Sequence, residues 1–190
     1  AGCSRMYYRR EPRFYVNVAF CGAYCMYNNQ YDRYRWQLYY SGADGKKGSW
    51  DYPRTGYVRL KHVSPGYNYL QGKTVKLPHL VIRYAEILLN YVEALNEYDP
   101  GNPDILKYLN MVRERAGLPG VESGLNQEDM REKIHHERRV ELCFEQLRYF
   151  DTRRWLKGYL NGGAFEGMNV DGGTSYDDPE FYQRTVFETR

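Results

Sequence analysis

The sequence predicts a mostly α-helical fold that carries an irregular, aromatic-rich part. Between residues 79 and 160, apolar residues recur at spacings of three and four, which is typical of amphipathic helices. Aromatic residues instead crowd residues 1–78, where the stretch 22–47 has neither a helical nor a strand period. A chain of 190 residues can bury one good core, so we expect both parts and an irregular segment at 161–190 to be subregions of one fold.

Charge and cysteine usage exclude several classes of function. The 27 Lys and Arg residues exceed the 24 Asp and Glu residues by only 3, and the signs alternate along the chain, so nucleic acid is not an expected partner. The longest apolar run, 77–82, is too short for a transmembrane helix. The sequence has no Cys-x-x-Cys pair and no His cluster that would predict a metal site, and we expect no cofactor. Whether Cys21 and Cys25 form a disulfide stays open.

The first part of the chain is expected to be extended or irregular. Residues 13–20 are aromatic and β-branched and follow Pro12, which predicts a short strand or extended segment. Residues 57–63 alternate between apolar and polar and predict a second strand. Between them, turn residues in 22–47 predict a long surface loop, and such loops within compact domains are usually functional.

Helical signals begin at Pro78 and define a hairpin. An apolar stripe from Ile82 to Leu95 predicts a first helix of about five turns. Asn102 is the expected cap of a second helix, with Pro103 at its first position and Gly117 at its end. Two helices joined by so short a turn form a hairpin similar in length to a tetratricopeptide repeat.

A third helix is expected to start near Asn126, with acidic residues in its first turn. It should continue through Phe144, and 147–156 should form a further helical piece. Glycines after Gly158 predict an irregular loop, and residues 181–187 are expected to be extended.

The ordered helical motifs resemble the C-terminal helical part of the SusD/RagB family. The motifs are Arg83–Leu89, Glu93–Glu97, Leu109–Pro119 and Glu137–Trp155, and Tyr7–Tyr15 resembles a segment from the middle of the family's proteins. The resemblance therefore implies that the chain is an internal piece of a longer protein, containing the last of four tetratricopeptide-like hairpins and a ligand-facing subregion. Two positions depart from the family: Val92 stands where alanine is common and Gln146 where glycine is common, and both are expected on helices.

The resemblance also implies a function without catalysis. Members of this family are outer-membrane lipoproteins of Bacteroidetes that take up nutrients. They bind a glycan, or in some members a peptide, at the cell surface and deliver it to a SusC-like TonB-dependent transporter. Any contact of this protein with the membrane is then expected to run through a lipid anchor outside the present chain.

The aromatic loop contains the candidate ligand-binding residues. Flat Trp and Tyr rings cover the apolar faces of sugars at a low cost in side-chain entropy, and the interleaved polar residues supply hydrogen bonds. Ligand contacts vary between family members, so the assignment rests on this chemistry alone. The candidates are Trp36, Tyr31, Tyr34, Tyr39, Tyr40, Asn28, Asn29, Arg35 and Trp50, with Trp36 the preferred ring. The alternative is that these rings only pack the loop against the rest of the fold.

A charged cluster at 137–154 suggests acid/base chemistry, but a structural role is the preferred interpretation. Glu137, Glu141 and Glu145 are spaced by four on a helix, and Arg138 and Arg148 stand three residues from acidic partners, so the charges are expected to pair within the helix. Arginines that fork onto carboxylates and helix carbonyls are also expected to pin the third helix to the hairpin. Three rival functions remain: a peptide-binding member of the same family, a tetratricopeptide-type adaptor and, as the weakest, a glycoside hydrolase.

Overall fold

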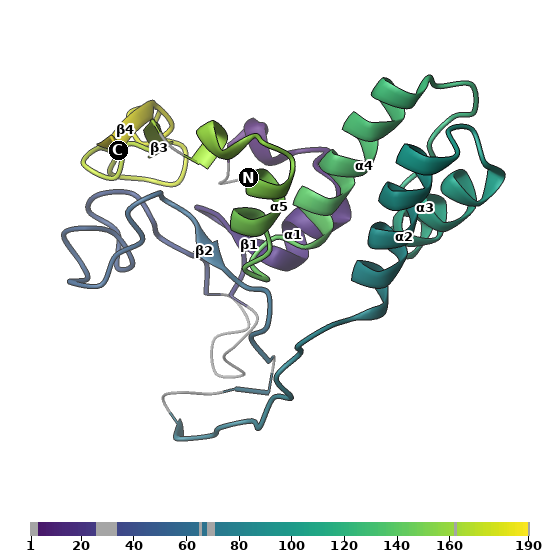
Figure 1. The fold of residues 1–190 in the computed structure, drawn as a ribbon. Coiled ribbons are helices and arrows are strands. Elements are labelled where there is room, and N and C mark those ends of the chain that lie inside the picture. Colours follow the sequence, from purple (N-terminus) through teal and green to yellow (C-terminus); the bar gives the residue numbers. More distant parts are fainter. Residues whose placement is uncertain (1–3, 26–33, 65, 68–70, 162, 190) are drawn as a thin grey trace. The chain divides into compact units, whose positions relative to one another are not determined.

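The computed structural model describes residues 4–25, 34–64, 66–67, 71–161 and 163–189 (Figure 1). The chain forms two compact units, and each has its own core. The helical unit comprises residues 11–13 and 78–158, and the loop unit comprises residues 1–10, 14–77 and 159–190.

The helical unit contains the expected hairpin and two further helices. Its elements are α2 (Tyr84–Tyr98), α3 (Pro103–Arg115), α4 (Gln127–Glu141) and α5 (Arg148–Arg154). Helix α2 packs against both α3 and α4, and the three helices lie side by side in Figure 1. The predicted helix-dominated fold is therefore confirmed. No helix within the described ranges is both long and apolar enough to cross a bilayer.

Local capping chemistry sets the boundaries of α3 and α4. The Asn102 side chain accepts a hydrogen bond from the Asp104 amide, and Pro103 occupies the first helical position, as predicted. Gly117 ends the helix with a φ of 73°, a conformation that glycine adopts without strain. Asn126 caps α4 by accepting from the Asp129 amide. These predictions hold because a cap depends only on residues close in sequence.

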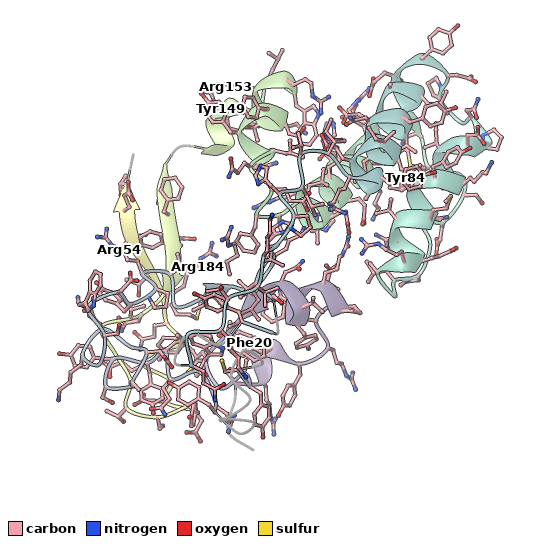
Figure 2. All side chains as sticks on the ribbon, turned by 90° about the horizontal axis from the view of Figure 1, so that it is seen from below. Phe20, Arg54, Tyr84, Tyr149, Arg153 and Arg184 are labelled. Atoms are coloured by element: carbon pink, nitrogen blue, oxygen red, sulfur yellow. The ribbon has the colours of Figure 1, made fainter. Side chains whose placement is uncertain are left out.

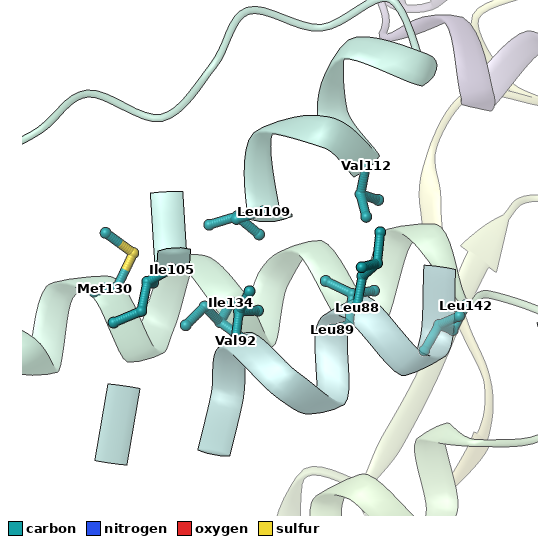
Figure 3. Packing of buried hydrophobic residues seen from close by; sticks show 9 residues of the cluster. All are labelled: Leu88, Leu89, Val92, Ile105, Leu109, Val112, Met130, Ile134 and Leu142. Carbon is teal, nitrogen blue, oxygen red and sulfur yellow. The ribbon is translucent and has the colours of Figure 1, made fainter. Parts of the chain in front are cut away.

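One apolar core joins α2, α3 and α4. Leu89 and Val92 of α2, Leu109 of α3 and Ile134 of α4 have no exposed surface at all. Their side chains meet between the helices (Figure 3). Burying each such side chain stabilises the fold by roughly 1.5–3 kcal/mol. The core residues of these helices belong to the apolar stripes that the spacing of three and four residues predicted.

Helix α2 begins six residues later than predicted, at Tyr84 rather than Pro78. Arg83 has extended backbone angles, and its guanidinium donates to Glu141 and Glu145. These bonds fix the start of the helix, so Ile82 stays outside it and is 62% exposed. The prediction was wrong here because the apolar pattern begins before Tyr84. The contacts of Arg83 with α4 and its following turn hold the chain extended at that point.

The third helix ends three residues earlier than predicted, and the expected further helical piece follows it as α5. Helix α4 ends at Glu141, and both Phe144 and Gln146 have left-handed backbones, with φ of 64° and 66°. Neither conformation continues a right-handed helix. Gln146 therefore lies in a turn and not on a helix as expected, and its left-handed conformation is one that glycine adopts more easily.

The loop unit starts with short helical elements rather than the predicted strand. Residues 5–7 form a 3-10 helix, and α1 spans Pro12–Asn17, with proline at a position that suits a helix start. Only Val18–Ala19 of the predicted strand 13–20 is a strand, β1. It pairs antiparallel with β2 (Val58–Arg59), which lies within the second predicted strand.

The end of the chain is more regular than predicted. Residues 158–161 form a 3-10 helix, and β3 (Ala164–Met168) pairs antiparallel with β4 (Arg184–Thr189), with a bulge after Phe165. The glycine-rich composition concealed β3, whose Gly167 lies so close to the backbone of Thr55 that a side chain would not fit.

Aromatic rings fill much of the interior of the loop unit. Tyr7 is 1% exposed and its ring lies against Phe20, with centroids 4.2 Å apart. A second cluster contains Cys21, Leu38, Tyr39, Val170 and Phe181. Burial raises the pKa of the Cys21 thiol above its ordinary value, and both Cys21 and Cys25 are free cysteines, which answers the open question of their pairing.

Replacing Gln146 by glycine is expected to stabilise the protein. A left-handed backbone costs a non-glycine residue roughly 1–2 kcal/mol, and the added freedom of glycine in the unfolded chain offsets roughly 0.5–1 kcal/mol of that gain. Urea denaturation of the full-length protein should therefore show a free energy of unfolding raised by up to about 1.5 kcal/mol.

The matched control is Lys133→Gly, an exposed position within α4. Glycine there should lower the free energy of unfolding by roughly 1 kcal/mol. If Gln146→Gly lowers stability as much as Lys133→Gly does, the left-handed turn is not a source of strain.

Candidate functional site

The aromatic loop of the loop unit is closed at its base by backbone hydrogen bonds. The Gly22 amide donates to the Trp36 carbonyl over 2.8 Å, and the Trp36 amide donates to Ala23 over 2.9 Å. The Cys25 amide donates to Tyr34 over 2.8 Å. These backbone hydrogen bonds hold residues 34–36 against residues 22–25. The main chain from which the following side chains project is therefore held in one position.

Arg35 lies between two aromatic rings. Its Cζ atom is 5.7 Å from the centroid of Tyr24 and 4.6 Å from that of Tyr176, and its Nε donates to the Gly22 carbonyl over 2.8 Å. Tyr24 is 62% exposed, so the outer side of this stack is open to solvent. Cation–π contacts of this kind orient the ring and the guanidinium together.

Asp44 ties its own turn to residues 34–37 of the loop. One of its carboxylate oxygens accepts from the Tyr34 hydroxyl over 2.6 Å and from the Gln37 amide over 2.9 Å. Burial, followed by the hydrogen bond to Asp44, raises the pKa of Tyr34 above its ordinary value. The hydroxyl therefore stays protonated and donates to the carboxylate.

Three glycines let the loop fold tightly on itself. A side chain at Gly42 would overlap the Gln37 carbonyl oxygen, one at Gly45 would overlap that of Tyr39, and one at Gly48 would overlap that of Gly42. The backbone segments are thus packed directly against each other. Such packing holds the residues between the glycines in place without help from their own side chains.

The packed loop presents exposed rings beside charged groups. Trp50 is 93% exposed and Tyr40 is 38% exposed. Lys46 pairs with Asp171, and its ammonium lies 5.8 Å from the ring centroid of Tyr52. The amide of Tyr40 donates to the Gly172 carbonyl over 3.0 Å, which ties the loop to the segment that carries Asp171. Tyr40, Lys46, Tyr52 and Asp171 are connected by these contacts, whereas Trp50 belongs to the same stretch only through its position two residues before Tyr52. These five residues are called the loop surface below.

The other predicted site residues are less accessible. Tyr39 is 9% exposed, and its ring meets that of Tyr176 edge to face. Trp36 is half-buried against the cluster of Leu38 and Phe181, and its indole Nε1 is buried without a hydrogen-bond partner among the described residues. Tyr34 and Arg35 are half-buried in the contacts given above. Asn28, Asn29 and Tyr31 lie outside the described residues.

Lys46, Tyr52 and Asp171 were missed by the sequence analysis. Lys46 and Tyr52 stand in the glycine-rich end of the loop, where the alternation of ring and charge continues past Trp36 and offered a signal. Asp171 lies 125 residues from Lys46 in sequence, and no local pattern connects the two. Nowhere in the described ranges do three or more His, Cys, Asp or Glu side chains form a group that could hold a metal ion.

The charged cluster of the helical unit is a network of buried ion pairs. Glu137 accepts from Arg13 over 2.5 Å through one oxygen and from Arg113 over 2.8 Å through the other. Glu141 binds Arg13 at 2.9 Å and Arg83 at 2.6 Å, and it also pairs with Arg115. Burial alone would raise the pKa of Glu141, but hydrogen bonds from Arg13 and Arg83 lower it below its ordinary value.

The expected pinning of the third helix to the hairpin is seen in the bonds of Arg83 and Arg113 to Glu141 and Glu137. Arg138, which was expected to pair with Glu141 on its own helix, donates to Asp151 over 2.9 Å and to Asn90 over 2.6 Å. Glu145 accepts from Arg83 over 2.7 Å. The charges therefore join different helices, because buried carboxylates that already face another segment gain more from partners there than from exposed neighbours on their own helix.

Glu93 is engaged in the same way and offers no free oxygen for chemistry. It pairs with Arg154 and accepts from the indole of Trp155 over 2.7 Å. The His135 imidazole stacks on Trp155 with centroids 3.6 Å apart, and burial lowers the pKa of this histidine below its ordinary value. A general acid needs a carboxyl group that is protonated near neutral pH, and these arginine-bound carboxylates are not suited to that role.

Comparison with known proteins places this arrangement in one family. The sequence matches the SusD family over residues 2–190. The chain belongs to the SusD family. A SusD-like protein of Formosa agariphila, P2, is 35% identical over 113 residues, which are 53% of this chain and 22% of P2. A second SusD-like protein from that organism, P25, is 36% identical over 95 residues, which are 17% of the length of P25.

Solved SusD-like structures share the fold. One from Bacteroides fragilis superposes with a TM-score of 0.77 at 30% identity, covering 97% of this chain and 34% of that one. A second from B. fragilis, described as a SusD-like carbohydrate-binding protein, has a TM-score of 0.71 at 28% identity and covers 98% of this chain and 38% of its own. This SusD-family chain thus spans between 17% and 38% of the length of these relatives.

Glu141→Gln is expected to destabilise the SusD fold strongly at neutral pH. The change leaves buried arginines without their charge partner, which costs roughly 3–5 kcal/mol. Because the pKa of Glu141 is lower in the folded state, its stabilisation is present above its unfolded pKa of roughly 4.3 and is lost as pH falls through the folded value. The gap in unfolding temperature between parent and variant should therefore close below about pH 4.

Thermal unfolding between pH 3 and pH 8, followed by circular dichroism, measures this gap. Glu122→Gln removes the same charge from an exposed loop and should change the unfolding temperature little at any pH. A gap that does not depend on pH would mean that shape, and not the ionised carboxylate, is what Glu141 contributes.

Proposed function

We propose that the protein binds an oligosaccharide at the loop surface without hydrolysing it. The observation that carries this proposal is the exposed ring of Trp50, 93% accessible on a loop whose backbone is fixed by close glycine packing. An indole this exposed contributes little to the stability of the fold. A sugar ring stacked on it would remove apolar area from water on both partners.

The neighbouring polar groups suit the rim of a sugar. Lys46 donates hydrogen bonds, Asp171 accepts them, and the Tyr40 hydroxyl does both. A hexose carries hydroxyls around an apolar face, so stacking and hydrogen bonding act on the same molecule. Membership of the SusD family, with a solved relative described as carbohydrate binding, supports this class of ligand.

Binding without turnover is proposed because the carboxylates of the helical unit are already used. Glu93, Glu137 and Glu141 each bind at least two cationic groups, and each is nearly inaccessible to solvent. Glycoside hydrolysis needs two carboxyl groups that face the sugar. Structural use of these side chains favours a binding protein over an enzyme.

The proposed cellular role follows from the family. The full-length protein would be held at the cell surface of the outer membrane by a lipid anchor and would pass its ligand to a SusC-like TonB-dependent transporter. The present chain would contribute one ligand-facing surface and the last helical hairpin to that larger protein.

The test is calorimetry of the full-length protein against a panel of oligosaccharides, followed by chromatography of each bound sugar after incubation. Binding with unchanged sugar is expected. Release of shorter products would identify an enzyme, and binding of peptides but of no oligosaccharide would identify a peptide-binding member of the family.

Trp50→Ala is expected to weaken binding of the oligosaccharide by about 1–3 kcal/mol, as truncation of an interface hot spot does. Since the indole is almost fully exposed, the unfolding temperature should stay within about 1 °C of the parent, which corresponds to a change of only a few tenths of a kcal/mol. Calorimetry and circular dichroism on the same samples measure the two quantities.

Trp36→Ala is the informative comparison. Its ring packs against the cluster that contains Leu38 and Phe181, so its loss should cost roughly 3 kcal/mol or less of stability. If Trp36→Ala abolishes binding in a folded protein while Trp50→Ala has no effect, the ligand sits at the half-buried end of the loop and the loop surface is not the site.

A further inference from the structure

The end of α5 is attached to the other helices by three side chains. The Arg154 guanidinium pairs with Glu93, and the Trp155 indole donates to the same carboxylate over 2.7 Å. The Lys157 ammonium pairs with Glu132. Two carboxylates, Glu93 on α2 and Glu132 on α4, therefore carry the polar contacts that hold residues 154–157 in place.

His135 of α4 lies close to both of these carboxylates. Its Nε2 atom is 3.9 Å from Oε1 of Glu93, and its Nδ1 atom is 4.0 Å from Oε1 of Glu132. The same two oxygens accept from Trp155 and from Lys157. Both distances exceed that of a hydrogen bond, so neither imidazole nitrogen takes an oxygen from its present donor.

The imidazole of His135 is buried and stacked. The residue is 8% exposed, and its ring lies on that of Trp155 with centroids 3.6 Å apart and 18° between the planes. Its Nδ1 atom is buried and has no hydrogen-bond partner within the described part of the chain. A neutral imidazole carries a proton on one nitrogen, whereas an imidazolium carries one on both. Protonation would therefore add a buried donor that has no acceptor within reach, which is costly.

The remaining contacts of α5 do not replace this attachment. Tyr149 and Arg153 lie next to each other on α5 in Figure 2, with the Arg153 Cζ atom 3.6 Å from the ring centroid of Tyr149. Both are exposed, and this contact stays within the helix. Asp151 accepts from Arg138 of α4 over 2.9 Å and anchors the middle of the helix. The helix is only seven residues long, so its last turn depends on Glu93, Glu132 and the stacked rings.

Charged groups approach His135 from every helix that surrounds it. Burial is the largest influence and lowers the pKa of His135 below its ordinary value, while Glu93 acts against it and Lys157 acts with it. The carboxylates attract a proton only weakly because each is already paired with a cation. The groups are Glu93 and Glu97 of α2, Glu132 and Arg138 of α4, and Arg154 and Lys157 at the end of α5.

The lowered pKa of His135 fixes the direction of the pH dependence. Since the folded pKa lies below the unfolded value of roughly 6.5, the unfolded or released state binds the proton more readily. The stacked state is therefore favoured above about pH 6.5 and loses stability as pH falls towards the folded value. This range lies above the one for Glu141, whose stabilisation is lost only below roughly pH 4.3.

We infer that His135 and Trp155 form a proton-sensitive latch, in which a neutral imidazole holds residues 154–157 against the helical unit and a protonated one releases them. The new N–H must either displace Trp155 or Lys157 from its carboxylate oxygen or turn towards solvent. Both movements separate the two stacked rings.

The latch acts on the connection between the two units. Residues 154–157 precede the point where the chain enters the loop unit, at Tyr159. The inference concerns side chains of the helical unit alone and does not depend on glycan binding at the loop surface.

The test follows the ring of Trp155 by fluorine NMR. 5-Fluorotryptophan is placed at position 155 of the full-length protein by codon suppression, and spectra are recorded from about pH 8 to about pH 5, the range in which histidine titrates. We expect the resonance of a stacked ring at high pH and that of a solvent-exposed indole to grow as pH falls. The ratio of released to stacked ring should rise by up to about tenfold per pH unit, because one proton is taken up.

Two variants separate His135 from other titrating groups. His135→Phe keeps an aromatic ring on Trp155 but cannot take up a proton, so its fluorine spectrum should not change over the same pH range. His136→Gln removes the neighbouring histidine, which is exposed, and should leave the response unchanged. Circular dichroism checks that both variants are folded.

A direct titration needs no variant. With carbon-13 in the imidazole of His135, the midpoint of protonation in the parent protein should coincide with the midpoint of release seen at Trp155.

Four results would overturn the inference. They are a fluorine spectrum of the parent that does not depend on pH, a response that persists in His135→Phe, a response that is lost in His136→Gln, and an imidazole that is protonated while the ring of Trp155 stays stacked.

Discussion

The helical unit depends on two buried carboxylates of α4 that are each bound by more than one arginine. Glu137 and Glu141 expose only 1% and 2% of their surface, and they bind arginines from residues 11–13, from the start of α2 and from α3. A buried charge is tolerated only while its partners stay in place. The position of each segment is therefore coupled to the others through α4, and the apolar core alone would not fix where α2 begins or where α4 ends.

Features that depend on sequence neighbours could be predicted, whereas those that depend on distant partners could not. The caps at Asn102 and Asn126 and the glycine stop at Gly117 follow from hydrogen bonds within a few residues. The late start of α2 follows from Arg83 reaching residues 58 and 62 positions away, and no periodicity contains that information. At Gln146 the sequence showed only that this residue stands where the family commonly has glycine. The left-handed backbone angle of the structure explains why glycine is favoured there.

The aromatic pattern identified the loop but not which rings face solvent. Tyr39 and Tyr40 are neighbours, and only Tyr40 remains open because the ring of Tyr39 packs against Tyr176, 137 positions further along the chain. The preferred ring, Trp36, packs into a cluster with Phe181 for the same kind of reason. Trp50 could be named from the sequence, but its exposure of 93% could not be predicted.

The glycine packing of residues 42–48 fixes part of the loop's shape through backbone contacts. Carbonyl oxygens occupy the space that side chains at Gly42, Gly45 and Gly48 would need, so these three positions take only glycine on the present path of the main chain. Substitutions at Lys46 and Lys47 leave these glycine contacts untouched. In evolutionary terms, the charge of the loop surface can therefore change at single positions while the path of the main chain is kept.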